Sequence, residues 1–273
     1  MNLIDCYHNI SKLLNFDDNG AFEARVILNH LLSLSYPFKD RILTDEELKR
    51  INDLVNKRRE GYPLQYLISN WDFYDMNFII GKGVLIPRPE TEMIVDYVLN
   101  VYDKNESLTI ADLCSGSGCI GMSLAKHLPN SKIYLIENSE EALPYIYKNI
   151  DKHNLSNVEV INTDLFNFDF DLINEKLDLI VSNPPYVPTA EISHLQKEVS
   201  YEPECALDGG ADGLDFYKVF AKDWTKQLNN GLFILECGEN QAYKIVDIFK
   251  DKYREYKILK DFNNIDRIVI FRI

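Results

Sequence analysis

Apolar residues recur at helical spacing in the first quarter of the chain. Between residues 21 and 34 they return every three or four positions, at Phe22, Val26, Ile27 and Leu31 among others, which is the period of an amphipathic helix. Thr44 and Glu47 have the spacing of a capping box and predict a second helix that ends near Gly61. Residues 1–70 are therefore predicted to form a small helical domain.

Residues 71–86 follow a different pattern. Aromatic and polar positions alternate there and two glycines follow, which predicts a β-hairpin. We interpret this hairpin as a linker between the helical domain 1–70 and a second domain, 87–273. A rigid, charged segment that begins at Pro87 leads from the hairpin into a helix predicted over residues 93–101.

From residue 108 the pattern is strand, turn, helix, repeated. Strands are predicted at 109–113, 132–137, 158–162, 177–182 and 231–237, and helices at 120–127, 140–153 and 241–250. Strands that alternate with helices indicate an α/β fold with a mostly parallel, doubly wound sheet. Two further apolar stretches, 256–262 and 267–273, are joined by a short link and predict a C-terminal antiparallel hairpin at the end of the sheet.

Composition narrows the class of protein. The 273 residues, 46% hydrophobic, suffice for the core of one large domain or two smaller ones. A net charge of −14 argues against a broad nucleic-acid surface. Five cysteines without C-x-x-C spacing indicate free thiols in a reducing cytoplasm and no metal site. The sequence shows neither a membrane-spanning run nor a signal peptide, so we expect a cytoplasmic protein without membrane contact.

A glycine-rich loop follows the first strand of the predicted sheet. Gly116, Gly118 and Gly121 satisfy G-x-G-x-x-G, and Glu137 ends the next strand. Glycine lets the backbone approach a nucleotide-containing cofactor, and the acidic residue can hold ribose hydroxyls. Nicotinamide enzymes and S-adenosylmethionine enzymes share this pattern, and a tight turn without a ligand is the third interpretation.

The residues around the loop favour S-adenosylmethionine. A carboxylate at Asp112 would lie near the positive sulfonium and amino groups of that cofactor, whereas it would repel the pyrophosphate of NAD. Asp164 and Leu165 follow the third strand, where a polar residue can read the adenine amino group and Leu165 can cover the ring. A turn cap is the alternative role for Asp164.

Asn183-Pro184-Pro185-Tyr186 ends the fourth predicted strand. The side-chain oxygen of Asn183 and the carbonyl of Pro184 are two acceptors that converge on one spot, which suits a planar NH2 group. The prolines fix the direction of the carbonyl, and Tyr186 can pack on the face of that group. The tetrapeptide is therefore interpreted as a clamp for an amide or amino nitrogen. If a methyl group is transferred to this nitrogen, positioning and electrostatic stabilisation would supply most of the rate enhancement.

Along nearly its whole length the chain resembles the HemK/PrmC-type protein-(glutamine-N5) methyltransferases. Residues 112–118 resemble the D-L-G-T-G-S-G of that family, and residues 182–186 its S-N-P-P-Y. Residues 86–92 resemble its I-P-R-P-E-T-E, and residues 202–214 its E-P…A-L-x-G-G-x-D-G-L. Amino-methylating enzymes of DNA and RNA share N-P-P-Y, so the flanking motifs make the resemblance specific.

The resemblance implies a class I S-adenosylmethionine-dependent methyltransferase fold (Rossmann-like) preceded by a substrate-docking helical domain. It implies methylation of N5 of the glutamine in the Gly-Gly-Gln motif of class I peptide chain release factors, which leaves S-adenosyl-L-homocysteine. We expect a monomer that contacts no nucleic acid directly. The predicted cofactor-binding residues are Asp112, Cys114, Ser115, Gly116, Ser117, Gly118, Glu137, Asp164, Leu165 and Asn183. The predicted substrate-binding residues are Arg88, Glu90, Asn183, Pro184, Pro185 and Tyr186, of which Asn183, Pro184 and Tyr186 are the predicted catalytic set.

Two positions depart from the pattern of the family. Cys114 replaces the first glycine of the loop, and Glu137 stands where aspartate is commoner. Because a cysteine needs an ordinary φ, we expect a slightly less tight loop. Glutamate keeps the ribose-binding carboxylate one methylene further out.

Three other functions are compatible with parts of the sequence. A nucleic-acid adenine N6 methyltransferase would use the same clamp on a flipped adenine, but the net charge of −14 and the lack of a basic recognition domain argue against it. A nicotinamide-dependent oxidoreductase leaves N-P-P-Y unexplained. A binding module without catalysis would not need Asn183 and Glu137.

Overall fold

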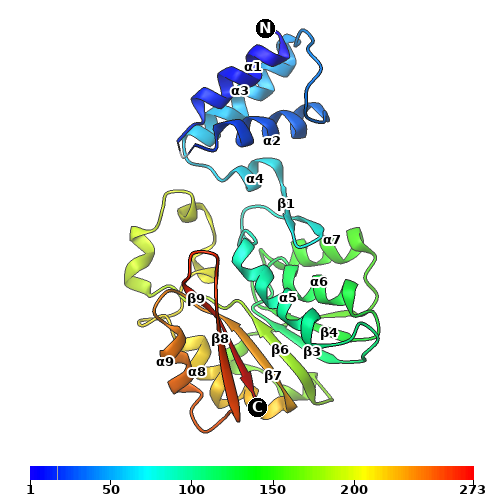
Figure 1. Cartoon of the computed structure of the whole chain (residues 1–273), viewed down its shortest axis with the longest axis vertical. Coiled ribbons are helices and arrows are strands. Elements are labelled where there is room, and N and C mark those ends of the chain that lie inside the picture. The colour runs from blue at the N-terminus through cyan, green and yellow to red at the C-terminus, as the bar shows by residue number, and fades with distance from the viewer. Residues whose placement is uncertain (17) are drawn as a thin grey trace. The chain divides into compact units, whose positions relative to one another are not determined.

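The computed structural model describes residues 1–16 and 18–273, and the chain divides into two compact units (Figure 1). The first unit contains residues 1–70 and 196–201, and the second contains residues 71–195 and 202–273. This division differs from the predicted one at two places. The hairpin region 71–86 belongs to the second unit, and residues 196–201, predicted to lie in the catalytic domain, belong to the first.

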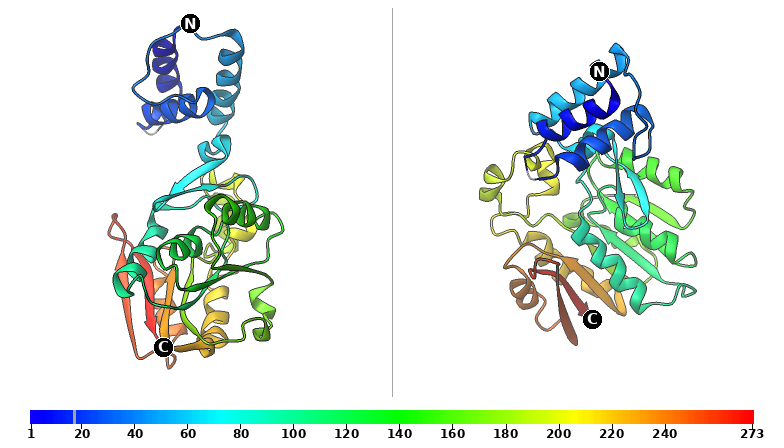
Figure 2. Two further views of the ribbon diagram at one scale, coloured as in Figure 1. Left: turned by 90° about the vertical axis from the view of Figure 1, so that its right-hand side faces the viewer. Right: turned by 45° about the horizontal axis from the view of Figure 1, so that its top comes forward.

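Four helices form most of the first unit: α1 (Leu3–Leu13), α2 (Gly20–Leu32), α3 (Asp45–Arg59) and α4 (Leu64–Ile68). Helix α2 packs against both α1 and α3, and each of the three buries apolar side chains; Figure 2 shows these helices in two further views. The predicted capping box is present at the start of α3. The N–H of Glu47 donates to Thr44 Oγ1 at 3.2 Å, and the N–H of Thr44 donates to Glu47 Oε2 at 2.9 Å.

A buried ion pair ties residues 196–201 to these helices. The guanidinium of Arg58 donates to both carboxylate oxygens of Glu23, at 2.8 Å each, and lies 2.7 Å from Glu198 Oε1. Arg58 is 5% exposed. A bidentate arginine–carboxylate pair is among the strongest polar contacts of a protein, and a buried charge needs such a partner. The Arg58 contacts therefore explain why 196–201 packs with the first unit.

The second unit is built on a seven-stranded sheet of order β5-β4-β3-β6-β7-β9-β8. Neighbouring strands are parallel except for β9, which is antiparallel to both β7 and β8. The strands are β3 (Thr109–Leu113), β4 (Lys132–Glu137), β5 (Val158–Asn162), β6 (Leu177–Ser182), β7 (Leu228–Glu236), β8 (Glu255–Lys260) and β9 (Asp266–Arg272).

Helices cover both faces of this sheet. On one face α8 (Asp215–Lys222) buries two aromatic side chains and α9 (Ala242–Ile248) buries Ala242 and Ile245, in a core that also contains Leu113, Ile136 and Phe233. Figure 1 shows α5 (Glu92–Val101), α6 (Cys119–His127) and α7 (Leu143–His153) on the other side. Short 3-10 helices lie at Pro89–Thr91 (η1), Leu165–Asn167 (η2), Phe170–Leu172 (η3), Thr189–His194 (η4), Val199–Tyr201 (η5), Glu204–Ala206 (η6) and Trp224–Gln227 (η7).

The predicted α/β fold is confirmed, with two features that the pattern did not show. The first four strands of the sheet have the predicted bounds. The terminal hairpin is antiparallel as predicted, but β9 pairs between β7 and β8 instead of extending the edge in chain order. Helix α8 was not predicted.

The hairpin pairs β1 (Asn70–Phe73) with β2 (Met76–Ile79). Phe73 and Phe78 are 1% and 0% exposed. Asn149 on α7 accepts from the N–H of Ile79 at 2.7 Å and donates to its carbonyl at 3.1 Å. Apolar burial and these two hydrogen bonds join the predicted linker hairpin to the second unit.

Candidate active site

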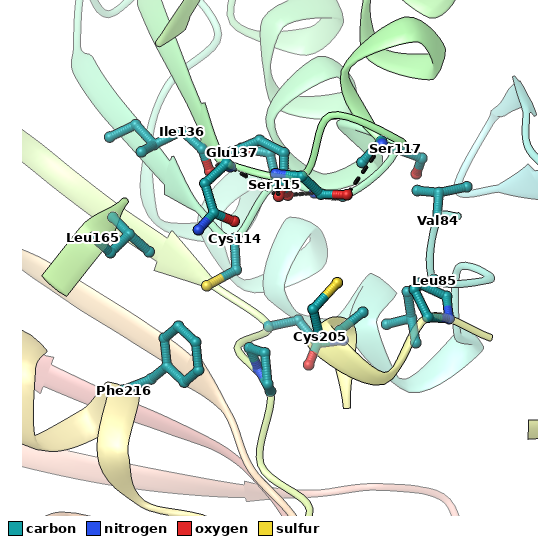
Figure 3. A pocket seen from close by; sticks show the side chains of 18 of the residues that line it. Val84, Leu85, Cys114, Ser115, Ser117, Ile136, Glu137, Leu165, Cys205 and Phe216 are labelled. Atoms are coloured by element: carbon teal, nitrogen blue, oxygen red, sulfur yellow. Dashed lines mark hydrogen bonds between the residues drawn. The ribbon is translucent and has the colours of Figure 1, made fainter. Parts of the chain in front are cut away.

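A cavity of about 450 Å³ lies at the carboxyl ends of β3, β4 and β6 (Figure 3). Its walls come from the glycine loop after β3, the end of β4, the turn after β5 and the first residues after β6, together with parts of 83–91 and 203–216. The edge formed by strand carboxyl ends is where open α/β sheets bind ligands, and the volume is that of a small-molecule site.

The glycine loop has the conformation that its sequence predicts. Gly116 and Gly118 have φ of 57° and 80°, in the left-handed region that favours glycine. A Cβ at Gly116 would meet Val84 at 3.8 Å and would otherwise face open space. The backbone at Gly116 is thus accessible from the cavity, as close approach of a ligand requires.

The expectation of an ordinary φ at Cys114 was wrong. Its φ is 58°, so the cysteine takes the left-handed conformation of the glycine that it replaces, at a cost of roughly 1–2 kcal/mol. The loop is fixed on either side, because the N–H of Gly116 donates to Glu137 Oε2 at 2.7 Å and Ser115 Oγ donates to the carbonyl of Asp112 at 2.7 Å. The sulfur of Cys114 points into the cavity (Figure 3), and burial raises the pKa of this thiol well above its usual value.

Asp112 and Glu90 do not occur among the described residues that line either cavity. The Asp112 side chain is 0% exposed, and its Oδ2 accepts from the N–H of Gly121 at 2.9 Å. Its Oδ1 has no hydrogen-bond partner within the described part of the chain. Burial raises the pKa of Asp112 to about 8. This carboxyl group therefore joins β3 to α6 beneath the loop, and does not face a cofactor as we predicted.

Gly118 lines neither cavity in the described part of the chain, whereas the remaining predicted cofactor residues lie together in the wall of the larger one. Glu137 accepts from the N–H groups of Asn138 and Ser139 at 3.0 and 2.9 Å, in addition to that of Gly116. Asp164 caps η2 by accepting from the N–H of Phe166 at 3.0 Å. The turn cap, which was the alternative role for Asp164, is therefore present. The lining includes Cys114, Ser115, Gly116, Ser117, Glu137, Asp164, Leu165 and Asn183.

Asn183 lies where the large cavity meets a smaller one of about 40 Å³. Asn183 and Arg88 line both, whereas Pro184 and Tyr186 line only the smaller cavity. The Asn183 amide donates from Nδ2 to Thr91 Oγ1 at 3.1 Å. Among the hydrogen bonds of the described residues, none ends at Asn183 Oδ1 or at the Pro184 carbonyl. The two acceptors of the predicted clamp are therefore available to a ligand.

The glycine-rich segment 207–214 packs against the backbone of this clamp and forms hydrogen bonds with the residue that follows it. The N–H of Val187 donates to the Leu207 carbonyl at 2.9 Å, and the N–H of Gly209 donates to the Val187 carbonyl at 2.9 Å. Gly213 has a φ of 71°, and a Cβ there would lie 2.3 Å from the carbonyl oxygen of Tyr186. A side chain at residue 213 would displace the backbone of the clamp, which is the physical reason for glycine.

Arg88 is held by Glu202. Its guanidinium lies 2.5 Å from Glu202 Oε1, and Glu202 Oε2 accepts from the N–H of Ile86 at 2.9 Å. The two motifs that flank N-P-P-Y in the sequence thus meet through one ion pair. Arg88 lines both cavities from this position.

Sequence reasoning assigned no role to several wall residues. Cys205 and Phe216 face the cavity, as do Val84 and Leu85 from the hairpin region (Figure 3). The ring of Phe216 meets that of Phe166 edge-on at 5.0 Å. The motif over 202–214 was the available signal for Cys205. No local pattern marked Phe216.

The order of the sheet, the glycine loop after β3 and the acidic end of β4 define a class I methyltransferase. Over residues 93–200 the chain matches the Methyltransferase small domain, and over residues 5–68 the PrmC N-terminal domain. The hMettl16 catalytic domain, solved in complex with MAT2A 3'UTR hairpin 6, superposes with a TM-score of 0.58 at 15% identity, covering 88% of this chain and 86% of that one. At such low identity the likeness shows the fold alone.

Two relatives are far more similar in sequence. The release factor glutamine methyltransferase of Thermodesulfovibrio yellowstonii is 39% identical, covering 96% of both chains. The protein of that name from Moorella thermoacetica is 39% identical over 92% of this chain and 90% of its own. The chain belongs to the release factor glutamine methyltransferase family, and the resemblance seen in its motifs is confirmed.

Proposed function

We propose that this protein methylates the side-chain amide nitrogen of the glutamine in the Gly-Gly-Gln motif of class I release factors. The observation that carries the proposal is the position of Asn183 between a cofactor-sized cavity and a small slot lined by Pro184 and Tyr186. A glutamine side chain that enters the slot would meet the two available acceptors where the larger cavity begins.

The residues of the large cavity fit S-adenosylmethionine. Glu137 offers a carboxylate at the end of β4, Gly116 exposes backbone, and Leu165 adds an apolar surface. When bound, this cofactor supplies an electrophilic methyl group. Asp112 would contribute by holding the glycine loop in place through Gly121, and not by direct contact.

The chain's own groups would orient the acceptor. An amide nitrogen is a weak nucleophile because its lone pair is delocalised into the carbonyl. Asn183 Oδ1 and the Pro184 carbonyl would each accept one hydrogen of the glutamine NH2, which fixes the nitrogen and favours the positive charge that develops on it. A methylated amide nitrogen with that charge loses its proton readily, so a strong base is not needed.

The test incubates the protein with labelled S-adenosylmethionine and either a purified class I release factor or DNA. We expect label in the release factor, and a gain of one methyl group on the Gly-Gly-Gln glutamine by mass spectrometry. Label in DNA and none in the release factor would favour the adenine methyltransferase instead. A matched release factor with Gly-Gly-Glu in place of Gly-Gly-Gln should remain unlabelled.

The helical first unit is proposed to dock the release factor. Its helices are separately packed and contribute no residue to the lining of the 450 Å³ cavity among the described residues. On addition of release factor, hydrogen exchange should slow on the exposed faces of α1–α3. Unchanged exchange throughout the first unit would contradict docking there.

Two further properties are part of the proposal. The free thiols suit a reducing cytoplasm, and a monomer satisfies every role assigned above. In the described part of the chain, the helices are too short or too polar to cross a membrane.

A further inference from the structure

Two buried residues, Thr91 and Glu236, hold the Asn183 side chain through a chain of hydrogen bonds. Asn183 Nδ2 donates to Thr91 Oγ1 at 3.1 Å, and the Thr91 hydroxyl donates to Glu236 Oε2 at 2.5 Å. Thr91 is 2% exposed and Glu236 is 1% exposed. The three residues come from η1, from the end of β7 and from the turn after β6, so the sheet brings them together from distant parts of the sequence.

The direction of these hydrogen bonds is fixed by the number of protons. An ionised carboxylate only accepts, so Thr91 must give its single hydroxyl hydrogen to Glu236. The Thr91 oxygen can then only accept, and Asn183 must present its NH2 to it. The Asn183 oxygen is thereby left on the other side of the amide, available to the slot.

A protonated Glu236 permits the opposite arrangement. Its carboxylic O–H can donate to Thr91, and Thr91 can then donate to Asn183 Oδ1. The amide of Asn183 would have to turn over and would present NH2 to the slot. An NH2 group cannot accept a hydrogen from a glutamine amide, so this arrangement removes one acceptor of the clamp.

We propose that Thr91 and Glu236 are positioning residues, and that ionised Glu236 selects the orientation of the Asn183 amide in which its oxygen faces the methyl acceptor. This inference rests on the proposed function, because the required orientation follows from a donor NH2 in the slot. Among the described residues Glu236 lines neither cavity, and Thr91, although it lines the larger one, is 2% exposed. They act through Asn183.

The surroundings of Glu236 place its titration in an accessible range. Burial raises the pKa of Glu236 to about 7, against the lowering effect of the Thr91 hydrogen bond. The charged and titratable groups that face it are Arg88, Glu90, Cys119, Tyr186, Tyr217, Cys237 and Arg267. Because the ionised form is the active one, turnover should rise as the pH increases through about 7.

Three substitutions test the role by kinetics. Thr91→Val removes the hydroxyl at nearly constant volume, and Glu236→Gln removes the charge that fixes the direction. Each should lower kcat for the release factor by about a hundredfold, the scale of a misplaced catalytic group, with KM nearly unchanged because docking is elsewhere. Thr91→Ser keeps the hydroxyl and should retain most of the rate. In Glu236→Gln the acidic limb of the kcat profile should disappear.

A matched control separates this role from fold stability. Thr225 is also buried, 6% exposed, and donates to the Ala221 carbonyl at 2.9 Å away from both cavities. Thr225→Val should lower the melting temperature but leave kcat and its pH profile unchanged. Wild-type kcat and an unchanged pH profile in both Thr91→Val and Glu236→Gln would overturn the proposal.

A measurement without turnover keeps the proposal testable if those variants fail to fold. With 15N-labelled asparagine, the side-chain NH2 resonances of Asn183, assigned by their loss in Asn183→Ala, should shift in wild type with a midpoint near the pKa of Glu236. A shift absent between pH 5.5 and 8.5 would refute the coupling. Failure of the wild-type protein to methylate the release factor would instead refute the proposed function. The two results are distinguishable because the Asn183 resonances report the coupling to Glu236 without any turnover.

Discussion

Replacement of Asn183 by alanine removes one of the two acceptors that face the slot. The side-chain oxygen and the Pro184 carbonyl both lack a donor within the described chain, so alanine at residue 183 leaves the Pro184 carbonyl as the remaining acceptor of the clamp. Loss of one preorganised polar contact at a reacting centre costs about 2.7–4 kcal/mol, or roughly a hundredfold to a thousandfold in turnover. The fold should suffer less, because Thr91 loses one donor but keeps its hydrogen bond to Glu236. That loss is worth about 1 kcal/mol.

The assay measures initial rates with purified release factor and labelled S-adenosylmethionine, and calorimetry measures cofactor affinity separately. Cofactor affinity should change little, since the wall retains Glu137, Leu165 and the glycine loop. Asn157→Ala is the matched control. Asn157 donates to the carbonyls of Ala125, Leu128 and Ser131 and lines neither cavity in the described chain, so its loss should cost stability without lowering turnover.

Asn183→Asp tests the orientation more sharply. Aspartate keeps an acceptor oxygen but, when ionised, cannot donate to Thr91, which would then lie between two carboxylates. The added charge should favour binding of the positive sulfonium without restoring the rate. Undiminished methylation by Asn183→Ala would refute the clamp, and Asn183-Pro184-Pro185-Tyr186 would then be only a stiff exit from β6.

Three further outcomes are expected. Glu137→Ala should weaken S-adenosylmethionine binding in calorimetry, because the carboxylate also orders Gly116; unchanged affinity would remove it from the site. Arg58→Ala should cost about 3–5 kcal/mol of unfolding free energy, because it leaves the Glu23 carboxylate buried and unpaired, whereas Arg41→Ala, at a more solvent-accessible pair, should cost far less in the same denaturant titration. The raised pKa of Asp112 means that the folded state holds a proton that the unfolded state loses above pH 4. The stability that this group contributes is therefore lost as the pH rises toward 8. In denaturant titrations between pH 5 and 7, Asp112→Asn should reduce the fall of unfolding free energy with pH by about 1.4 kcal/mol per pH unit.

The local sequence pattern determined the strands, the helix cap and the motifs at the strand ends. Strands β3 to β6 have the bounds predicted from apolar runs between turn residues, and Thr44 starts a helix through the predicted capping box. The glycine loop and Asn183 end their strands at one edge because parallel strands direct all their carboxyl ends the same way. Period and turn chemistry are local properties, so a single sequence carries them.

Tertiary structure decided which groups face one another. Asp112 sits between two residues that face the α8 and α9 core, so strand alternation turns its carboxyl toward α6 and away from the cavity. Cys114 accepts a glycine conformation because its neighbours are fixed by Glu137 and by the carbonyl of Asp112.

Contacts between distant parts of the chain were also decided by packing. Residues 196–201 join the first unit through Arg58, and β9 pairs between β7 and β8. The link from Thr91 to Glu236 spans 145 residues. The sequence by itself determined the elements and the clamp at their end. Only the folded chain decided what holds that clamp, because a contact across such a separation depends on how whole elements pack and leaves no periodic signal at either residue.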